Sequence, residues 1–333
     1  AVGSYCGEFG QSQNSVAIGY RSGLNGQQNN SIAIGSYCGE LFQNSSSVAV
    51  GSYCGYRSQG FNSVAIGYGS GQYYQTEGSV SIGFTSGQYS QGQGSIAVGY
   101  ACGQNYQSQN SVAIGYASGG NSQGRASVAI GYGSGGNSQG ENSVAIGAYS
   151  GGDYQHSNSV AIGYIAGADN QDMYSVAIGS YAGFKYQSSS SIAIGYMSGF
   201  LTQGIYSVAV GSWCGYNGQG NYSTSIGYGS GYLNQNQNCV AVGYESGREN
   251  QGINSVAIGY QSGYQNQSGG SVALGYASGR QSQQGQAIAL GYQAGEDNQG
   301  IYCVAMSTAA GQNYQNNQAI AIGQQAGATS QGS

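Results

Sequence analysis

Large aliphatic and small side chains alternate in a five-residue string that returns along the whole chain. The string is Ser-Val-Ala-Ile-Gly or a close variant, and it begins at Ser15, at Ser31, at Ser47 and at every sixteenth residue thereafter. Its second and fourth places are aliphatic, whereas its first and third places are small. This period of two predicts a short β-strand that ends at the glycine.

The constant spacing of the string predicts the fold. It runs through residues 1–333 without insertion or deletion, which gives about 21 repeats. Equal units can stack so that each strand pairs in parallel with the next. We therefore predict an all-β, parallel β-solenoid with one 16-residue repeat per coil, continuous over residues 1–333 and cut from a longer chain. Stacked helices are excluded because the 64 glycines would destabilise helix interiors.

The two faces of the predicted strand differ in the side chains that they tolerate. We expect the valine and isoleucine of each coil to be buried inside the solenoid. The first and third places accept only Ser, Ala or Cys, so something should approach that face closely. The hypothesis is a side-by-side homo-oligomer in which the small strips of two or three copies meet, with end-to-end joining into a filament as a further expectation.

Two columns of the repeat are constant and predict structural ladders. Numbered from the serine of the string, place 9 is always Gly and place 13 is always Gln. A solvated Gln would vary as its neighbours do, so we predict amides that hydrogen-bond from coil to coil. Glycine at place 9 predicts a corner with positive φ or close backbone approach. The residues assigned to these ladders are Gln11, Gln27, Gln43, Gln59, Gln75, Gln91 and Gln107, with Gly7, Gly23 and Gly39.

A third column is aromatic. Place 6 is Tyr in most repeats, and where it is Ser or Ala, as at Ser36, place 7 usually becomes aromatic, as at Tyr37. The ring is kept while its attachment moves by one residue, which predicts rings stacked at the coil spacing. We interpret the column as a stabilising ladder; the alternative is a row of platforms for sugars. The residues assigned to it are Tyr20, Tyr68, Tyr100, Tyr116 and Tyr132.

The seven cysteines occupy columns that hold Ser or Ala in other repeats. No Cys-x-x-Cys pattern for zinc occurs in the sequence. Cys38 and Cys54 lie one coil apart, but parallel side chains hold their Cβ atoms farther apart than a disulfide favours. We therefore expect free thiols.

Charged residues make up only 5% of the chain, with one histidine and six basic residues. Such a chain has few groups for acid–base or metal chemistry and cannot neutralise a run of phosphates. We predict that it is not an enzyme, and that it has no cofactor, no metal site and no nucleic-acid partner. Its short apolar runs predict no membrane span in this segment.

The string Asn-Ser-Val-Ala-Ile-Gly at residues 14–19 and 62–67 resembles the head repeats of trimeric autotransporter adhesins, the YadA-like head. Residues 289–295 are also similar to repeats in fibre proteins of large viruses and phages. The resemblance implies a left-handed β-roll, three chains packed side by side, and a surface that binds host matrix or other cells. The 16-residue repeat and its aromatic column depart from the family's usual shorter unit.

We predict a structural fibre or filament protein that is extracellular or lies on the surface of a cell or virion. The alternative is an adhesin head that binds host matrix or glycans through the tyrosines and the variable turns. Ice binding is a weaker alternative, because flat solenoid faces can order water but this chain has only scattered threonines.

Overall fold

A computed structural model describes residues 1–330, which form short strands and turns without any helix. The chain divides into two compact units, with the boundary after Asn170. A single continuous solenoid over residues 1–333 stays a prediction. Gln331, the last glutamine of its column, lies outside the described residues.

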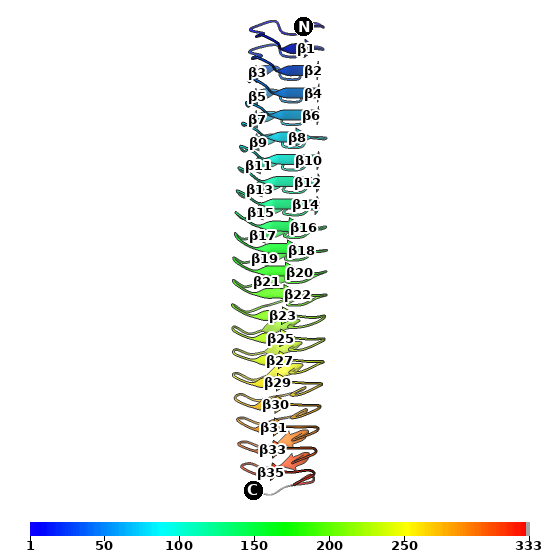
Figure 1. Cartoon of the computed structure of the whole chain (residues 1–333), viewed down its shortest axis with the longest axis vertical. Helices are drawn as coiled ribbons and strands as arrows, with labels where there is room; N and C mark the ends of the chain where they lie inside the picture. Colours follow the sequence, from blue (N-terminus) through cyan, green and yellow to red (C-terminus); the bar gives the residue numbers. More distant parts are fainter. Residues whose placement is uncertain (331–333) are drawn as a thin grey trace. The chain divides into compact units, whose positions relative to one another are not determined.

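In the first unit, the recurring string forms a parallel sheet whose strands follow one another along the stack (Figure 1). Each strand pairs with the strand 16 residues later, place for place, so that Ile96 faces Val112 and Ala97 faces Ala113. The strands are β1 (Val16–Ile18), β2 (Ile32–Ser36), β4 (Val48–Ser52), β6 (Val64–Tyr68), β8 (Val80–Ile82), β10 (Ile96–Tyr100), β12 (Val112–Tyr116), β14 (Val128–Tyr132), β16 (Val144–Ile146) and β18 (Val160–Ile162).

A second row of strands in the first unit ends at the place-13 glutamines, and it also pairs in parallel, as Gln107 does with Gln123. These strands are β3 (Leu41–Gln43), β5 (Arg57–Gln59), β7 (Tyr73–Gln75), β9 (Tyr89–Gln91), β11 (Asn105–Gln107), β13 (Asn121–Gln123), β15 (Asn137–Gln139) and β17 (Asp153–Gln155). Strand β19 (Asp169–Gln171) spans the boundary between the units.

The second unit repeats this plan with the same register, so that Val256 faces Val272. Its string strands are β20 (Val176–Ile178), β22 (Ile192–Ile194), β23 (Val208–Val210), β25 (Thr224–Ile226), β27 (Val240–Val242), β29 (Val256–Ile258), β30 (Val272–Leu274), β31 (Ile288–Leu290), β33 (Val304–Met306) and β35 (Ile320–Ile322). Its glutamine strands are β21 (Lys185–Gln187), β24 (Asn217–Gln219), β26 (Leu233–Gln235), β28 (Glu249–Gln251), β32 (Asp297–Gln299) and β34 (Asn313–Gln315).

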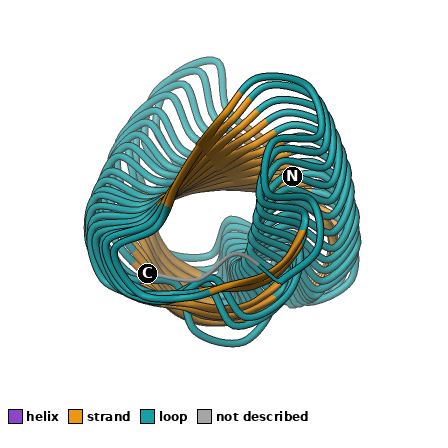
Figure 2. Cartoon of the chain, turned by 90° about the horizontal axis from the view of Figure 1, so that it is seen from below, coloured by secondary structure: helices purple, strands orange, loops and turns teal. Residues whose placement is uncertain are grey.

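Most coils therefore carry strand on two sides with loops between them (Figure 2), whereas a few, such as the coil of Gln203, have only an isolated bridge on the glutamine side. The partners of every pairing lie 16 residues apart. The predicted parallel β-solenoid with one repeat per coil is confirmed. Its handedness stays a prediction.

The aliphatic side chains of the string point outwards, which corrects the expectation that they fill the coil. Ser95 and Ala97 are fully buried, whereas Ile66 and Ile114 keep 38% and 37% of their surface exposed. Alternation along a strand shows that its two faces differ, but not which of them lies inside. The interior also holds the glutamine side chains, so only small residues fit opposite them. The small strips consequently line the inside of the coil and cannot meet another copy.

The expectation of free thiols is wrong for one pair of cysteines. Cys38 and Cys54 form a disulfide between neighbouring coils, with their Cα atoms 4.8 Å apart. Coil stacking thus brings the two backbones within the range that disulfides span. The other cysteines are free: Cys6, Cys102, Cys214, Cys239 and Cys303.

Candidate functional site

The place-13 glutamines brace the inside of each coil. Nε2 of Gln107 donates to the Ile96 carbonyl on the opposite strand at 2.8 Å, and to the Ser111 carbonyl at the start of the next coil at 3.2 Å. Its Oε1 accepts from Nε2 of Gln91 at 3.4 Å. The Gln107 side chain is 1% exposed, so its amide replaces water for these carbonyl groups.

The Nε2 bonds recur in the other glutamines assigned from the sequence, except in the opening repeat, whereas the buried Oε1 atoms of Gln27, Gln43 and Gln75 accept no hydrogen bond. Their Nε2 atoms donate to place-2 carbonyls, and the buried members are Gln27, Gln43, Gln59, Gln75 and Gln91. Direct amide-to-amide bonds join Gln43 to Gln59 and Gln75 to Gln91, each at 3.2 Å. Gln11 is half-buried and reaches only the Ser15 carbonyl, at 3.2 Å. The stabilising role of this ladder stays a prediction.

The constant glycine of place 9 is required by the constant glutamine of place 13. Gly23 has φ of +57°, and a Cβ added there would lie 2.7 Å from Oε1 of Gln27. Gly7 and Gly39 have the same left-handed backbone and face their own glutamines in the same way. One buried amide therefore accounts for both constant columns, because it occupies the space that a side chain at place 9 would need.

The place-6 aromatic rings form a ladder in each unit. We call Tyr68, Phe84, Tyr100, Tyr116 and Tyr132 the first tyrosine ladder, and Tyr228, Tyr244, Tyr260, Tyr276 and Tyr292 the second tyrosine ladder. Centroids of successive rings lie 4.8 to 5.3 Å apart in both ladders. Their planes are parallel within 12°. Each ring keeps between 42% and 52% of its surface exposed.

The stack is broken where the ring moves to place 7. Tyr20, assigned to the ladder from the sequence, meets Tyr5 and Tyr37 edge to face, at interplanar angles of 87° and 77°. Tyr132 meets Tyr149 at 69°. Moving the attachment point by one residue preserves contact between rings but not their parallel stacking.

A second aromatic column, which was not predicted from the sequence, stands at place 10 of the second unit. Phe184, Phe200, Tyr216 and Tyr232 stack with centroids 4.9 to 5.0 Å apart. The signal was present, because each of these residues directly follows the constant glycine of its repeat.

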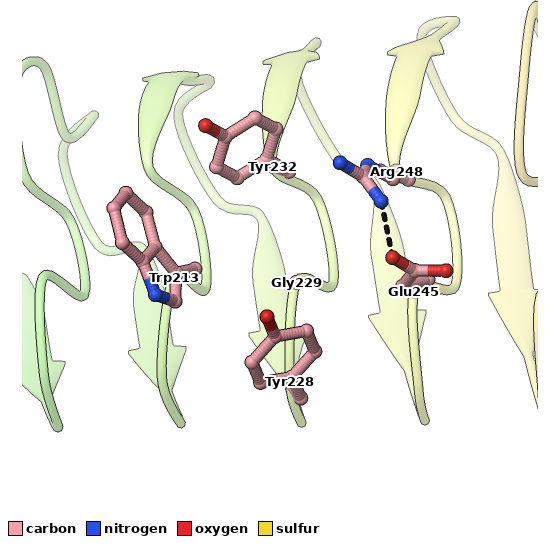
Figure 3. Close-up of a pocket in the computed structure, with 6 residues that line it drawn as sticks. All are labelled: Trp213, Tyr228, Gly229, Tyr232, Glu245 and Arg248. Atoms are coloured by element: carbon pink, nitrogen blue, oxygen red, sulfur yellow. Dashed lines mark hydrogen bonds and ion pairs between the residues drawn. The ribbon is translucent and has the colours of Figure 1, made fainter.

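A small pocket of about 170 Å³ lies between the two aromatic columns of the second unit. Tyr228 and Tyr232 come from one coil and flank Gly229, which stands at place 7 of that coil (Figure 3). Trp213 lines the pocket from the coil before. Glu245 and Arg248 line it from the coil after. We call these six residues the Trp213 pocket.

The charges beside the Trp213 pocket are already paired. Arg248 forms an ion pair with Glu245, and its guanidinium lies 5.2 Å from the centroid of the Tyr232 ring. Oε2 of Glu245 accepts a hydrogen bond from Nε2 of Gln261 at 2.9 Å. Because Arg248 occupies the cation site over Tyr232, the pocket favours a neutral ligand over a further cation.

Within residues 1–330, no three His, Cys, Asp or Glu side chains come together as a metal site. No helix in that range is long and apolar enough to cross a membrane. The absence of enzymatic activity and of a cofactor stays a prediction.

A family model described as the YadA head domain repeat matches residues 122–150, 157–182 and 251–262. No curated protein matches the chain. The resemblance of the repeats to YadA-like heads is therefore confirmed, and it indicates an adhesin-like fibre protein of the cell surface.

Proposed function

We propose that this chain is the stiff segment of a surface fibre in which copies pack side by side through their outward aliphatic rows. The observation that supports this proposal is the partial exposure of the aliphatic side chains of the string, which are half-buried or exposed in every coil. Ile82 and Ile114 in the first unit and Ile226 in the second keep 37%, 37% and 40% of their surface exposed. A monomer would leave this row in water, where each isoleucine is about two-fifths exposed and so forgoes roughly 0.6–1.2 kcal/mol of burial free energy, the same share of the roughly 1.5–3 kcal/mol that full burial provides.

The partner that suits this row is a second copy of the same chain. An identical copy presents the same side chains at the same coil spacing, so each coil of one can face a coil of the other. Three copies around a common axis are what the resemblance to YadA-like heads suggests. A solenoid continuous over residues 1–333 would give the assembly a row of full length, at the surface of a cell or a virion.

Light scattering on the full chain tests this association. We expect an oligomer for the wild type, and a shift to the monomer for the double variant Ile82→Lys/Ile114→Lys. The matched control is Gln93→Lys/Gln109→Lys, which adds the same charge at exposed positions of a turn and should leave the mass unchanged. A monomeric wild type, or equal masses for both variants, would refute the proposal.

Adhesion to glycans is a second candidate function, and the Trp213 pocket is the observation that favours it. A volume of about 170 Å³ falls below the usual range for drug-sized ligands and suits one sugar ring at the end or within a glycan chain. Its wall of three aromatic rings would stack on the sugar, while Glu245 and Arg248 would bond its hydroxyl groups.

A glycan array with the oligomeric chain tests this second function. We expect the wild type to bind and Trp213→Ala to lose binding, because the variant lacks one aromatic wall of the pocket. The variant should keep the fold, because alanine stands at the same place in other coils, such as Ala117. Tyr149→Ala removes a place-7 ring that does not line the Trp213 pocket, and it should leave binding intact. An array without hits, or equal loss in both variants, would count against adhesion by this pocket while leaving the fibre role untouched.

A further inference from the structure

The tyrosine ladders bring reactive phenol rings together in a way that fibre formation does not require. Tyr100, Tyr116 and Tyr132 stack with centroids 4.8 Å apart and planes 3° and 4° from parallel. Each ring is 45% to 47% exposed, so an oxidant in solvent can reach it. The second tyrosine ladder offers the same geometry at Tyr260 and Tyr276, 4.9 Å and 5° apart.

We propose that the two tyrosine ladders are oxidative cross-linking sites, at which neighbouring tyrosines are joined by carbon–carbon bonds into dityrosine. The oxidant class is a peroxide that acts through a haem peroxidase. Two phenol groups each give up one electron and one proton. Hydrogen peroxide takes up the two electrons and the two protons and becomes two molecules of water. The two tyrosyl radicals couple at the ring carbons next to the hydroxyl groups. The hydrogens on those carbons then move to the oxygens, which restores both aromatic phenols.

Parallel stacking favours this coupling over other fates of the radicals. Successive side chains leave the backbone at the same place of the repeat, so the ring carbons beside the hydroxyl groups lie about one coil apart. Exposed rings turn rapidly between orientations, and only a short approach is needed for two such carbons to meet. Holding both reactants in place in this way raises their effective concentration far above that of separate molecules.

Solitary tyrosines on the same chain provide a test of geometry against exposure. Tyr106 is 67% exposed, more than any ring of the ladders. Its neighbours one coil away in the same column are Ser90 and Ser122, which follows from the pairing of β11 with β9 and β13. If exposure alone decided which tyrosines react, Tyr106 would be the preferred target. If a stacked neighbouring tyrosine is required, Tyr106 should react poorly, because it has none in its column.

The first tyrosine ladder also contains a natural interruption. Phe84 stands between Tyr68 and Tyr100, stacked on both at 5.3 and 5.0 Å. It lacks the hydroxyl group from which a phenoxyl radical forms, and it separates the two tyrosines by two coils. Cross-links are therefore expected on one side of Phe84, between Tyr100, Tyr116 and Tyr132, and not across it.

A covalent link between neighbouring coils already exists inside the first unit. The Cys38–Cys54 disulfide joins side chains 16 residues apart, which is the separation that each dityrosine would have. Dityrosine cross-links along the ladders would join neighbouring coils covalently on the outside, as the disulfide does. They would oppose the separation of one coil from the next.

The experiment is to treat the dilute full chain with a haem peroxidase and a limiting amount of hydrogen peroxide. Dityrosine fluorescence gives the yield, and peptide mass spectrometry identifies linked tyrosines by the loss of two hydrogens. We expect links between residues 16 apart, above all Tyr100–Tyr116, Tyr116–Tyr132 and Tyr260–Tyr276, with Tyr106 unmodified.

Two phenylalanine variants make the result decisive. Tyr116→Phe keeps a stacked ring, as Phe84 does in the wild type, and should abolish both links of the first tyrosine ladder. Tyr106→Phe is the matched control and should leave the yield unchanged. Links that involve Tyr106, links across Phe84, or an unchanged yield of first-ladder links in Tyr116→Phe would overturn the proposal.

Discussion

Replacing Gln107 by alanine should weaken the coils around it far more than replacing Gln109, only two residues away. Both are glutamines of one repeat, but Gln107 is 1% exposed and spans the interior of the coil, whereas Gln109 is exposed to solvent. The pair therefore isolates the buried amide from residue type and from position along the chain.

The expected magnitude follows from the bonds that Gln107 makes. Its amide takes part in three hydrogen bonds, to Ile96, Ser111 and Gln91. At about 1 kcal/mol for each buried bond, their loss costs ~3 kcal/mol. The lost methylene group adds about 1 kcal/mol. Gln91 Nε2 is not stranded, because it keeps its bonds to the Val80 and Ser95 carbonyls.

The assay must resolve single coils, because stacked repeats need not unfold as one cooperative unit. Hydrogen exchange followed by mass spectrometry reports the protection of each segment. We expect Gln107→Ala to speed exchange in β10 to β13 while more distant coils of the first unit keep their protection. Gln109→Ala should match the wild type throughout.

A glutamate at the same position sharpens the test through pH. In Gln107→Glu, a buried carboxylate would replace the donor amide and face the Ile96 carbonyl, so burial should raise its pKa in the folded state. The variant should therefore be least stable at neutral pH and recover as the pH falls and the carboxyl group is protonated. Equal exchange in Gln107→Ala and Gln109→Ala, or a pH-independent Gln107→Glu, would refute the reasoning.

Three further predictions concern positions where the backbone or a buried sulfur is constrained. Gly103→Ala should destabilise its coil as much as Gln107→Ala, because its φ is +51° and the added Cβ would lie 2.5 Å from Oε1 of that glutamine; wild-type hydrogen exchange in β10 to β13 would contradict this. Non-reducing peptide mapping should recover Cys38 linked to Cys54, and Cys38→Ser should speed hydrogen exchange in β2 to β5 only under non-reducing conditions. Burial raises the pKa of Cys214 from 9.0 to about 11, so stability from the neutral thiol is complete below pH 9 and is lost as the pH rises through 11. Relative to Cys214→Ser, the wild type should lose up to about 3 kcal/mol over that range in chemical unfolding, and a constant difference would argue against a buried thiol.

Much of the fold could be predicted because the repeats of this one chain can be aligned with one another. Twenty-one copies of one unit show which places never change, and a constant place in a chain of otherwise variable turns indicates a buried contact. Gln107 and Gly103 were identifiable in this way without any structure. The register of β10 on β12 followed as well, since equal units stack with equal places opposite each other.

The candidate pocket could not be predicted, because its walls come from unlike places of three successive repeats. Trp213 and Glu245 stand at place 7, Tyr228 at place 6 and Tyr232 at place 10. Their convergence depends on the path of the chain around the corner and on the absence of a side chain at Gly229. Neither appears in a comparison of columns.

The sequence by itself determined the recurring strand, its parallel register and the two constant columns, because each of these depends only on periodicity. The tertiary structure alone decided which face of the strand is inside and which cysteines meet. Alternation places Ile114 and Ala113 on opposite faces of the strand. The isoleucine points outwards because the buried side chain of Gln107 leaves room inside the coil only for a small residue. Likewise, the sequence places Cys38 and Cys54 one coil apart, but only the structure brings their two sulfur atoms together in a disulfide, because periodicity does not fix the direction in which a side chain points.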